Sequence, residues 1–439
     1  MRRLVILGAF GLLVAVTVSV IGNRQGTPDQ ATSSSPTGLG EVLADGFSPP
    51  ASPPEVQVAV GPRFPSTLSS SPTADEVQSK LWFNDATWWG VLIESSTAEM
   101  HLYRLDAESQ SWVDTGMLID ERSDARADVL WDGVHLYIAS GGDTSTAADH
   151  VRVMRYSYDP ETGTYALDQG FPVQLSDIGV RSLMIAKDTA GVAWVSYITA
   201  GQIWISSTGA NDASWGAPFP LPVAGTSVGP GVAVLVTHGP RMGLVWTNQA
   251  EGAVYFTSHA DGEAPGAWDP TTTILQGTQQ ADNHITARSL DGPDGPSLFV
   301  VVKTSLDVLP DRQPTDPQML LLELRPEGQW RSHVFGRLED RHSRPLLLLD
   351  EAARELYVFA VSPFGSGSVY YKRASADLID FRPGKGIPFL QMSDRPDITS
   401  PTSTKQNLNA ASGMVVMAAD LDSEHYVHGV LPLPGQPSP

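Results

Sequence analysis

Residues 80–94 read KLWFNDATWWGVLIE, in which two apolar runs flank an Asn-Asp turn and four of the first eleven side chains are aromatic. Strand-forming residues on both sides of a turn containing Asn or Asp are typical of a β-hairpin. Aromatic residues make up only 8% of the chain, so this concentration indicates a place where large apolar area is buried. We expect the rings to fill the wedge between neighbouring β-sheets, in preference to forming a carbohydrate-stacking platform.

Similar hairpins recur along the chain at an average spacing of about 54 residues, a period typical of propeller repeats. After the first, they span residues 126–140, 181–197, 229–247, 284–304, 344–362 and 407–420. An aromatic residue that follows a polar turn keeps the same period, at Trp112, Tyr165, Trp215, Trp268, Trp330 and Phe381. Four strands per repeat are typical of a propeller blade. We therefore predict an all-β chain folded as a single β-propeller of seven four-stranded blades, with six as the alternative count.

The last repeat is short, because residues 407–420 and 425–434 supply only about three strands. An isolated alternating segment, residues 55–61, lies far away at the other end of the repeats. We predict that this N-terminal strand joins the last blade and closes the ring, since closure removes the unpaired edges of the sheets. The propeller then spans residues 55–434, with a tail at 435–439. Residues 312–317 and 392–405 lie outside the pattern and are predicted to be long loops.

The first 54 residues have a different character from the rest of the chain. Arg2 and Arg3 precede an uncharged apolar run at residues 4–21, which indicates either a signal peptide or an N-terminal membrane anchor. Residues 22–54 are rich in Ser, Thr, Pro and Gly, so we predict a disordered linker there. These segments predict an extracytoplasmic protein that is either secreted or tethered to the membrane through residues 4–21.

Composition excludes several classes of function. The 439-residue chain has no cysteine, which rules out disulfides and thiolate-ligated metals. Its formal net charge of −21 argues against binding to nucleic acid, because phosphate backbones would be repelled. The histidines show no metal-ligand spacing and no phosphate-binding Gly-rich motif is present, so we predict neither metal nor cofactor; calcium in the acidic turns is the alternative that the sequence leaves open. We expect a monomer.

Two of the polar turns resemble the Asp-box of the sialidase-like (BNR-repeat) propellers, whose pattern is S-x-D-x-G-x-x-W. They are Ser207–Trp215 and, with a longer spacing, the turn from Ser258 to Trp268. The resemblance implies a propeller fold; in that family the box is a structural turn remote from catalysis. The Arg-Ile-Pro motif of sialidases is absent, and Arg344-Pro345 is the nearest match. The sialidase catalytic residues therefore cannot be assigned in this chain.

A set of cationic side chains stands near the start of the innermost strands: Lys80, Arg126, Arg181, His284 and Arg344, with Lys405 near the same register. Equivalent positions of a propeller converge at one mouth of its central channel, so we predict a ligand-binding cationic ring there. Arginine would hold a carboxylate, sulfate or phosphate through paired hydrogen bonds. The alternative is internal pairing, of Arg126 with Asp124 or Asp128 and of Arg344 with Asp340 or Glu339.

Three functions remain open from the sequence. The first is a surface-exposed binding propeller that recognises an anionic glycan or a protein partner through its axial face. The second is a sialidase-like glycoside hydrolase or lyase, for which Glu121, Asp124 and Asp128, or Asp394 and Asp397, are the available acids. The third is a structural scaffold in which all cations are internally paired. The missing catalytic pattern favours binding over catalysis, and the catalytic residues stay unassigned.

Overall fold

The structure is a computed structural model that describes residues 55–435 except 67, 69–70, 74–76, 143–150, 210, 365–366 and 393–395. The predicted signal peptide or anchor, the linker and residues 436–439 of the tail lie outside the described residues and stay predictions. The described part of the chain contains two short 3₁₀ turns, Leu306–Val308 and Leu338–Asp340, among its strands. It includes no helix with the length and apolar character needed to cross a membrane.

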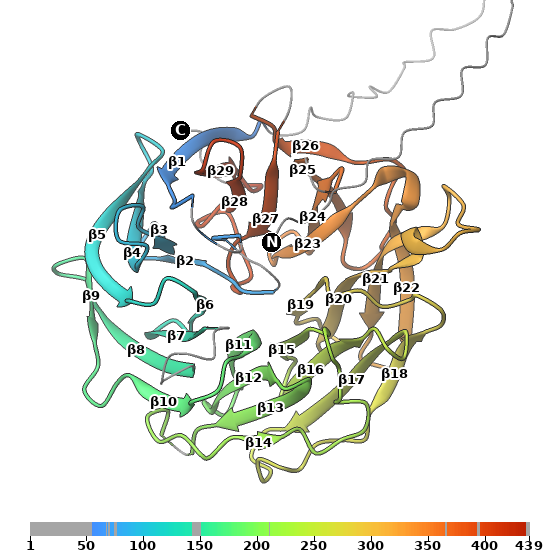
Figure 1. The fold of residues 1–439 in the computed structure, drawn as a ribbon, viewed down its shortest axis with the longest axis horizontal. Coiled ribbons are helices and arrows are strands. Elements are labelled where there is room, and N and C mark those ends of the chain that lie inside the picture. The colour runs from blue at the N-terminus through green and yellow to red at the C-terminus, as the bar shows by residue number, and fades with distance from the viewer. Residues whose placement is uncertain are drawn as a thin grey trace, which may run out of the picture. The chain divides into compact units, whose positions relative to one another are not determined.

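The described residues form seven antiparallel sheets arranged as blades around a ring (Figure 1). From the inside outward, blade 1 contains β2 (Leu81–Asn84), β3 (Thr87–Ile93), β4 (Met100–Asp106) and β5 (Ser111–Asp120). Blade 2 contains β6 (Ala125–Trp131), β7 (His135–Gly142) and β8 (Val151–Asp159), and both β9 (Thr164–Leu167) and β10 (Val173–Ser176) pair with β8. Blade 3 contains β11 (Arg181–Lys187), β12 (Ala193–Thr199), β13 (Gln202–Ser207) and β14 (Phe219–Pro220).

Blade 4 contains β15 (Ala233–Thr237), β16 (Arg241–Asn248), β17 (Ala253–Ala260) and β18 (Thr272–Gln276). Blade 5 contains β19 (Ile285–Leu290), β20 (Ser297–Lys303), β21 (Pro317–Leu324) and β22 (Trp330–Arg337). Blade 6 contains β23 (Ser343–Asp350), β24 (Glu355–Ser362), β25 (Ser368–Ser375) and β26 (Ile387–Leu390). Blade 7 contains β27 (Ile398–Thr402), β28 (Met414–Asp420), β29 (His425–Leu431) and, outermost, β1 (Gln57–Arg63).

The all-β propeller, its seven blades and its closure by an N-terminal strand are confirmed. β1 pairs antiparallel with β29, and Val58 lies opposite Gly429 in the register. The last blade therefore combines three strands from the C-terminal end of the chain with one from the N-terminal end (Figure 1). This arrangement closes the ring, because the first and last strands of the propeller pair with each other within one blade.

The prediction for the inside of blade 7 is wrong in one respect. Its innermost strand is β27, within the segment that the sequence pattern assigned to a long loop, and the strand expected from residue 407 begins only at Met414. β27 reads ITSPT, so it lacks the apolar alternation that identifies a strand. Its Ser400 and Thr402 are buried, and hydrogen bonds satisfy their polar groups; the Thr402 hydroxyl, for example, donates to the backbone oxygen of Gln78.

The aromatic residues of the first hairpin fill the wedges on both sides of blade 1, as predicted. Trp82 and Trp89 are buried in a cluster with residues of blade 2, and the Trp82 indole donates to the Tyr165 hydroxyl at 2.8 Å. Trp88 points the other way, into the cluster shared with blades 6 and 7, and donates to the Ser412 carbonyl at 2.9 Å. Adjacent strand residues face opposite sides of a sheet, so Trp88 and Trp89 bind blade 1 to both of its neighbours.

The chain crosses the axis of the ring immediately after β27. Gln406 forms hydrogen bonds with the backbone of Phe83 in blade 1, and Asn407 donates to the Ser289 carbonyl in blade 5. The preceding residue, Lys405, donates from its ammonium group to Asp128 in blade 2 and to the Ile185 carbonyl in blade 3. This axial segment, residues 402–407, therefore links four blades and occupies the centre of the ring.

Asp128 is fully buried and joins the blades that meet at the axis. Its carboxylate accepts hydrogen bonds from the backbone nitrogens of Ser79 at 2.8 Å and Ile185 at 2.7 Å, as well as from the Lys405 ammonium. Lys80 is buried beside it and donates to the Ala127 carbonyl at 2.6 Å. Burial lowers the pKa of Lys80 to about 7, with Asp128 opposing this shift and Arg126 adding to it.

Phe64 provides a test of ring closure, because it follows β1, is 5% exposed and packs edge-on against Tyr426 in β29 at a centroid distance of 5.3 Å. We expect Phe64→Ala to lower the free energy of unfolding by about 3–5 kcal/mol, the usual cost of removing a buried phenylalanine. Chemical denaturation of the chain from residue 55 onward measures this. The matched control is Leu378→Ala at a 78% exposed position, where less than about 0.5 kcal/mol is expected. Equal losses in the two variants would contradict the closure.

The lowered pKa of Lys80 predicts a pH dependence of stability. Between pH 7 and 10.5 the unfolded chain holds a proton on Lys80 that the folded protein has lost, so raising the pH through this range stabilises the folded state. Relative to Lys80→Met, we expect the free energy of unfolding of the wild type to rise by up to about 1.4 kcal/mol per pH unit. Denaturation curves at several pH values measure this, with the exposed Lys385→Met as control. A constant difference between wild type and Lys80→Met across this range would contradict the assignment.

Candidate functional site

A cavity of about 400 Å³ lies at the face where the innermost strands begin. It brings together three of the five cationic residues predicted from the sequence: Arg181 from blade 3, His284 from blade 5 and Arg344 from blade 6. Lys303, Asp282, Asp307, Val308 and Phe364 also line it. We call this cavity, with these lining residues, the entry-face cavity.

β-Bulges shape the strand starts that border the entry-face cavity. The register of blade 6 shifts between Ser343 and Leu346, and Arg344 in this bulge has a φ of +53°. The register of blade 3 shifts between Arg181 and Met184, where Ser182 has a φ of +51°. A left-handed backbone is unfavourable for a side chain with a Cβ, and such strained residues occur frequently at functional sites. Bulges at both positions redirect the side chains of the strand starts.

The Arg344 guanidinium is held between a hydroxyl and an aromatic ring. Its Nη1 donates to the Ser400 hydroxyl at 3.1 Å, and its Cζ lies 6.0 Å from the ring centroid of Phe364. Phe364 is 55% exposed, a large value for an aromatic side chain. Asp340, a partner proposed from the sequence, accepts a hydrogen bond from the Arg337 backbone nitrogen. The wall of the cavity therefore places an arginine beside an accessible aromatic face.

Asp282 lines the cavity and is held in place by several hydrogen bonds. Its carboxylate accepts hydrogen bonds from the Lys303 ammonium at 2.7 Å, the Asn283 backbone nitrogen at 2.6 Å and the Ser305 hydroxyl at 3.2 Å. Burial alone would raise the pKa of Asp282, but the hydrogen bond from His284 and the charge of Lys303 hold it well below its usual range. Asp282 is therefore a permanent carboxylate and cannot act as a general acid.

His284 is oriented by this carboxylate. Its Nδ1 lies 2.5 Å from Asp282 Oδ1, and no hydrogen bond to its Nε2 occurs within the described residues. Burial lowers the pKa of His284; Asp282 opposes this, while Arg344 and Lys303 add to the lowering. The side chain is therefore neutral near pH 7, with the proton on Nδ1 and the lone pair of Nε2 available.

The remaining predicted cations do not line the entry-face cavity. Lys80 is buried and Lys405 is partly buried at the axis, where they bond to Ala127 and Asp128. Arg126, the second residue of β6, is close enough to Lys80 to help lower its pKa. The structure therefore divides the expected ring into a group of three at the mouth and a group deeper in the channel.

The acids considered for catalysis are dispersed. Glu121 is exposed and forms an ion pair with Arg152 at 2.9 Å, and Asp128 belongs to the axial network. Asp394 lies outside the described residues. Burial, together with the neighbouring carboxylates Asp420 and Asp422, raises the pKa of Asp397. None of these acids that the structure describes lines the entry-face cavity, and neither does a tyrosine among the residues described there.

Sequence reasoning missed several residues of the cavity. Asp282 precedes the predicted strand start at residue 284, and Lys303 ends the second strand of the same hairpin. In an antiparallel hairpin, the end of the second strand returns to the start of the first, so Lys303 could have been found from its pairing partner. Phe364 carries a local signal too, because an aromatic residue preceding Gly-Ser-Gly is not part of a strand pattern.

No family model matches the chain, and no curated protein matches it. Among solved structures, polysaccharide lyase Uly1 matches with a TM-score of 0.50 at 7% identity, over 81% of this chain and 90% of that chain. A PL25 ulvan lyase bound to -[GlcA(1-4)Rha3S]- matches with a TM-score of 0.49 at 8% identity, over 83% of this chain and 95% of that chain. The NanB sialidase of Streptococcus pneumoniae matches with a TM-score of 0.35 at 10% identity, over 66% of this chain and 49% of that chain. At these identities the likeness concerns the fold alone, and the seven-bladed ring agrees with the propeller that the sialidase-like resemblance implied.

Proposed function

We propose that this protein binds an anionic glycan outside the cytoplasm, through the entry-face cavity of its propeller. The observation that carries the proposal is the gathering of Arg181, Lys303 and Arg344 around one cavity in a chain whose formal net charge is −21. The apolar run at residues 4–21 supports an extracytoplasmic location, and a membrane tether at the cell surface is part of the proposal.

The charges of the cavity favour an anionic group. Three cationic side chains line it, together with the two carboxylates of Asp282 and Asp307. Lys303 lies between these carboxylates, at 2.7 Å from Asp282 and 3.6 Å from Asp307. The two guanidinium groups come from different blades and line the same cavity. The planar guanidinium of arginine matches the geometry of a carboxylate or sulfate. A concave site concentrates the electrostatic field of such cations on the ligand.

The uncharged part of the cavity favours a sugar ring over a simple ion. Phe364 and Val308 are 55% and 64% exposed and line the same cavity as the arginines. An aromatic face beside a cation suits a sugar, which presents apolar C–H groups on one face and charged or hydroxyl groups at its edge. The volume of about 400 Å³ lies within the usual range for small-molecule sites. The structurally similar Uly1 is named a polysaccharide lyase, which is compatible with a glycan ligand.

The test of this proposal is the removal of one guanidinium at the cavity. We expect the wild-type chain from residue 55 onward to bind a uronate or sulfated oligosaccharide in isothermal titration calorimetry. Arg344→Gln should weaken that binding at least about tenfold, because charge-assisted hydrogen bonds are worth roughly 1.5–3 kcal/mol. Arg373→Gln, at a 48% exposed arginine of β25, is the matched control and should bind as the wild type does. Equal affinity in the two variants, or the absence of binding to every acidic glycan tested, would refute the proposal.

A second candidate function is supported by His284. A neutral histidine, oriented by a carboxylate and close to Arg344, has the arrangement needed to remove a proton from a carbon next to a carboxylate. With a uronate bound to the arginines, Nε2 would take the C5 proton, a C4–C5 double bond would form, and the C4–O bond would break. The leaving oxygen would then take a proton from the imidazolium or from water. This is a lyase reaction, and it needs no pair of acids.

The lyase candidate predicts an unsaturated uronate product, detected by its ultraviolet absorbance. In His284→Ala we expect the rate to fall by about 10²-fold or more, the usual contribution of a general base, while glycan affinity stays within about threefold of the wild type. If the wild type binds the glycan but releases no unsaturated product, the protein is a binding propeller without lyase activity.

A further inference from the structure

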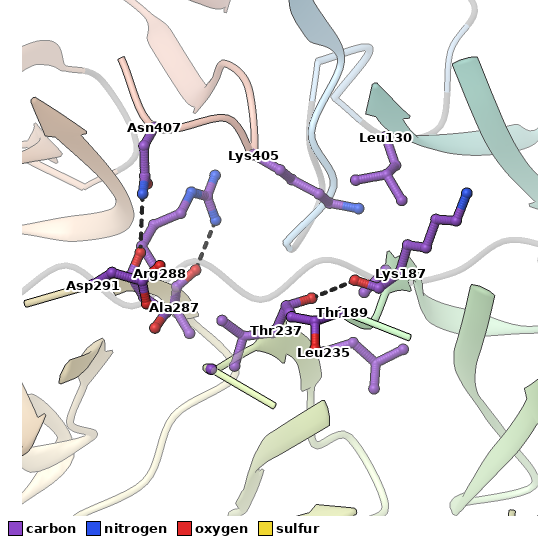
Figure 2. Close-up of a pocket in the computed structure, with 14 residues that line it drawn as sticks. Leu130, Lys187, Thr189, Leu235, Thr237, Ala287, Arg288, Asp291, Lys405 and Asn407 are labelled. Carbon is purple, nitrogen blue, oxygen red and sulfur yellow. Dashed lines mark hydrogen bonds between the residues drawn. The ribbon is translucent and has the colours of Figure 1, made fainter. Parts of the chain in front are cut away.

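A second cavity, of about 280 Å³, opens at the opposite face, where the innermost strands end. It is lined by Lys187 at the end of β11, Thr237 at the end of β15, Ser289 near the end of β19, and Lys405 of the axial segment. Figure 2 shows Arg288 and Asn407 on one side of this cavity, Lys187 on the opposite side and Lys405 extending between them. We call it the exit-face cavity.

The axial cations share a single carboxylate. Lys80 and Arg288 are buried and Lys405 is partly buried, and the Asp128 carboxylate is close enough to act on the charge of all three. Their hydrogen bonds go largely to backbone oxygens: Arg288 donates to Ala287 at 2.7 Å and to Thr404 at 2.6 Å, and its Nε has no partner within the described part of the chain. Carbonyl groups satisfy the donors but do not neutralise the charge, so Arg288 and Lys405 together exceed the single carboxylate of Asp128 even where Lys80 has lost its proton.

Two of these three cations, Arg288 and Lys405, line the exit-face cavity. Burial lowers the pKa of Arg288 to about 10 and also lowers that of Lys405, as expected for positive charge that is incompletely compensated. Lys187 is different, because it forms ion pairs with Asp132 at 2.6 Å and Asp212 at 3.4 Å. The net attraction for an anion therefore comes from the Arg288 side of the cavity.

The other walls determine which anion suits the cavity. Leu130, Leu235 and Val236 provide an apolar surface, and Asp291 places an exposed carboxylate at the rim. The Thr237 and Ser289 hydroxyls already donate to the backbone oxygens of Lys187 and Ser297. A hydrated, multiply charged ion would lose its water against an apolar wall without gaining donors in return. A compact molecule with one carboxylate and an apolar body matches both the charge and the wall.

We propose that the exit-face cavity binds a small monoanionic carboxylic acid, whose carboxylate lies against Arg288 and Lys405 and whose apolar body lies against Leu130 and Leu235. The axial segment separates this site from the entry-face cavity, because Lys405 and Thr404 are bonded to blades 2, 3 and 5 across the axis. The proposal is therefore independent of the glycan site, and the two can fail separately.

The test uses benzoate and isovalerate as ligands, benzamide as the uncharged analogue of benzoate, and inorganic phosphate as a simple anion. Isothermal titration calorimetry on the chain from residue 55 onward should show one saturable site for a carboxylate, at least about tenfold tighter than for benzamide or phosphate. Arg288→Met should abolish the binding. Asp291→Asn removes only an exposed rim charge and should tighten it about twofold or more, so the test does not depend on the folding of a core variant.

Three results would overturn the proposal: no saturable binding of either carboxylate, equal binding of benzoate and benzamide, or stronger binding of phosphate. If Arg288→Met fails to fold, the affinity of Asp291→Asn for the carboxylate tests the proposal in its place. An unchanged affinity in Asp291→Asn would mean that any bound acid lies outside the exit-face cavity. Arg344→Gln serves as the separate control, because it alters the entry-face cavity and should leave benzoate binding unchanged.

Discussion

The interaction on which the centre of this propeller depends is the burial of the Asp128 carboxylate on the axis. It accepts hydrogen bonds from the backbone next to blade 1 and from blade 3, and it receives Lys405 from the axial segment. A buried carboxylate is tolerated only when it is paired and hydrogen-bonded, and Asp128 meets both conditions. Because this network occupies the centre of the ring, the two faces of the propeller carry separate cavities.

The two cavities differ in the way their cations are arranged. At the entry face, Arg181 and Arg344 come from different blades and lie beside the exposed Phe364, an arrangement suited to an extended polar ligand with an apolar face. At the exit face, Arg288 is almost completely buried and the cavity is smaller and partly apolar. Both positive regions occur in a chain of net charge −21, so they contrast with the rest of the surface and would draw anions toward the axis.

The fold was largely predictable from the sequence because the hairpins and their aromatic residues repeat, as Trp82 and Trp89 show. The exception was β27, in which Ser400 and Thr402 are buried and form hydrogen bonds that no apolar pattern reveals. The site was predictable only in part. Register alone suggested Arg181, His284 and Arg344, but it could not show that the chain crosses the axis near Lys405. Asp282 and Phe364 were missed because neither is a start residue of an innermost strand: Asp282 precedes β19 and Phe364 follows β24, and the folded structure brings both to one cavity.

The central claim is that an acidic glycan occupies the entry-face cavity, and the most direct measurement is a crystal structure of residues 55–435 soaked with an acidic oligosaccharide. We expect density for a sugar in this cavity, with a carboxylate or sulfate within about 3 Å of the Arg181 or Arg344 guanidinium and the sugar ring against Phe364. Density for the sugar on an outer blade surface, with the entry-face cavity occupied only by solvent, would contradict it.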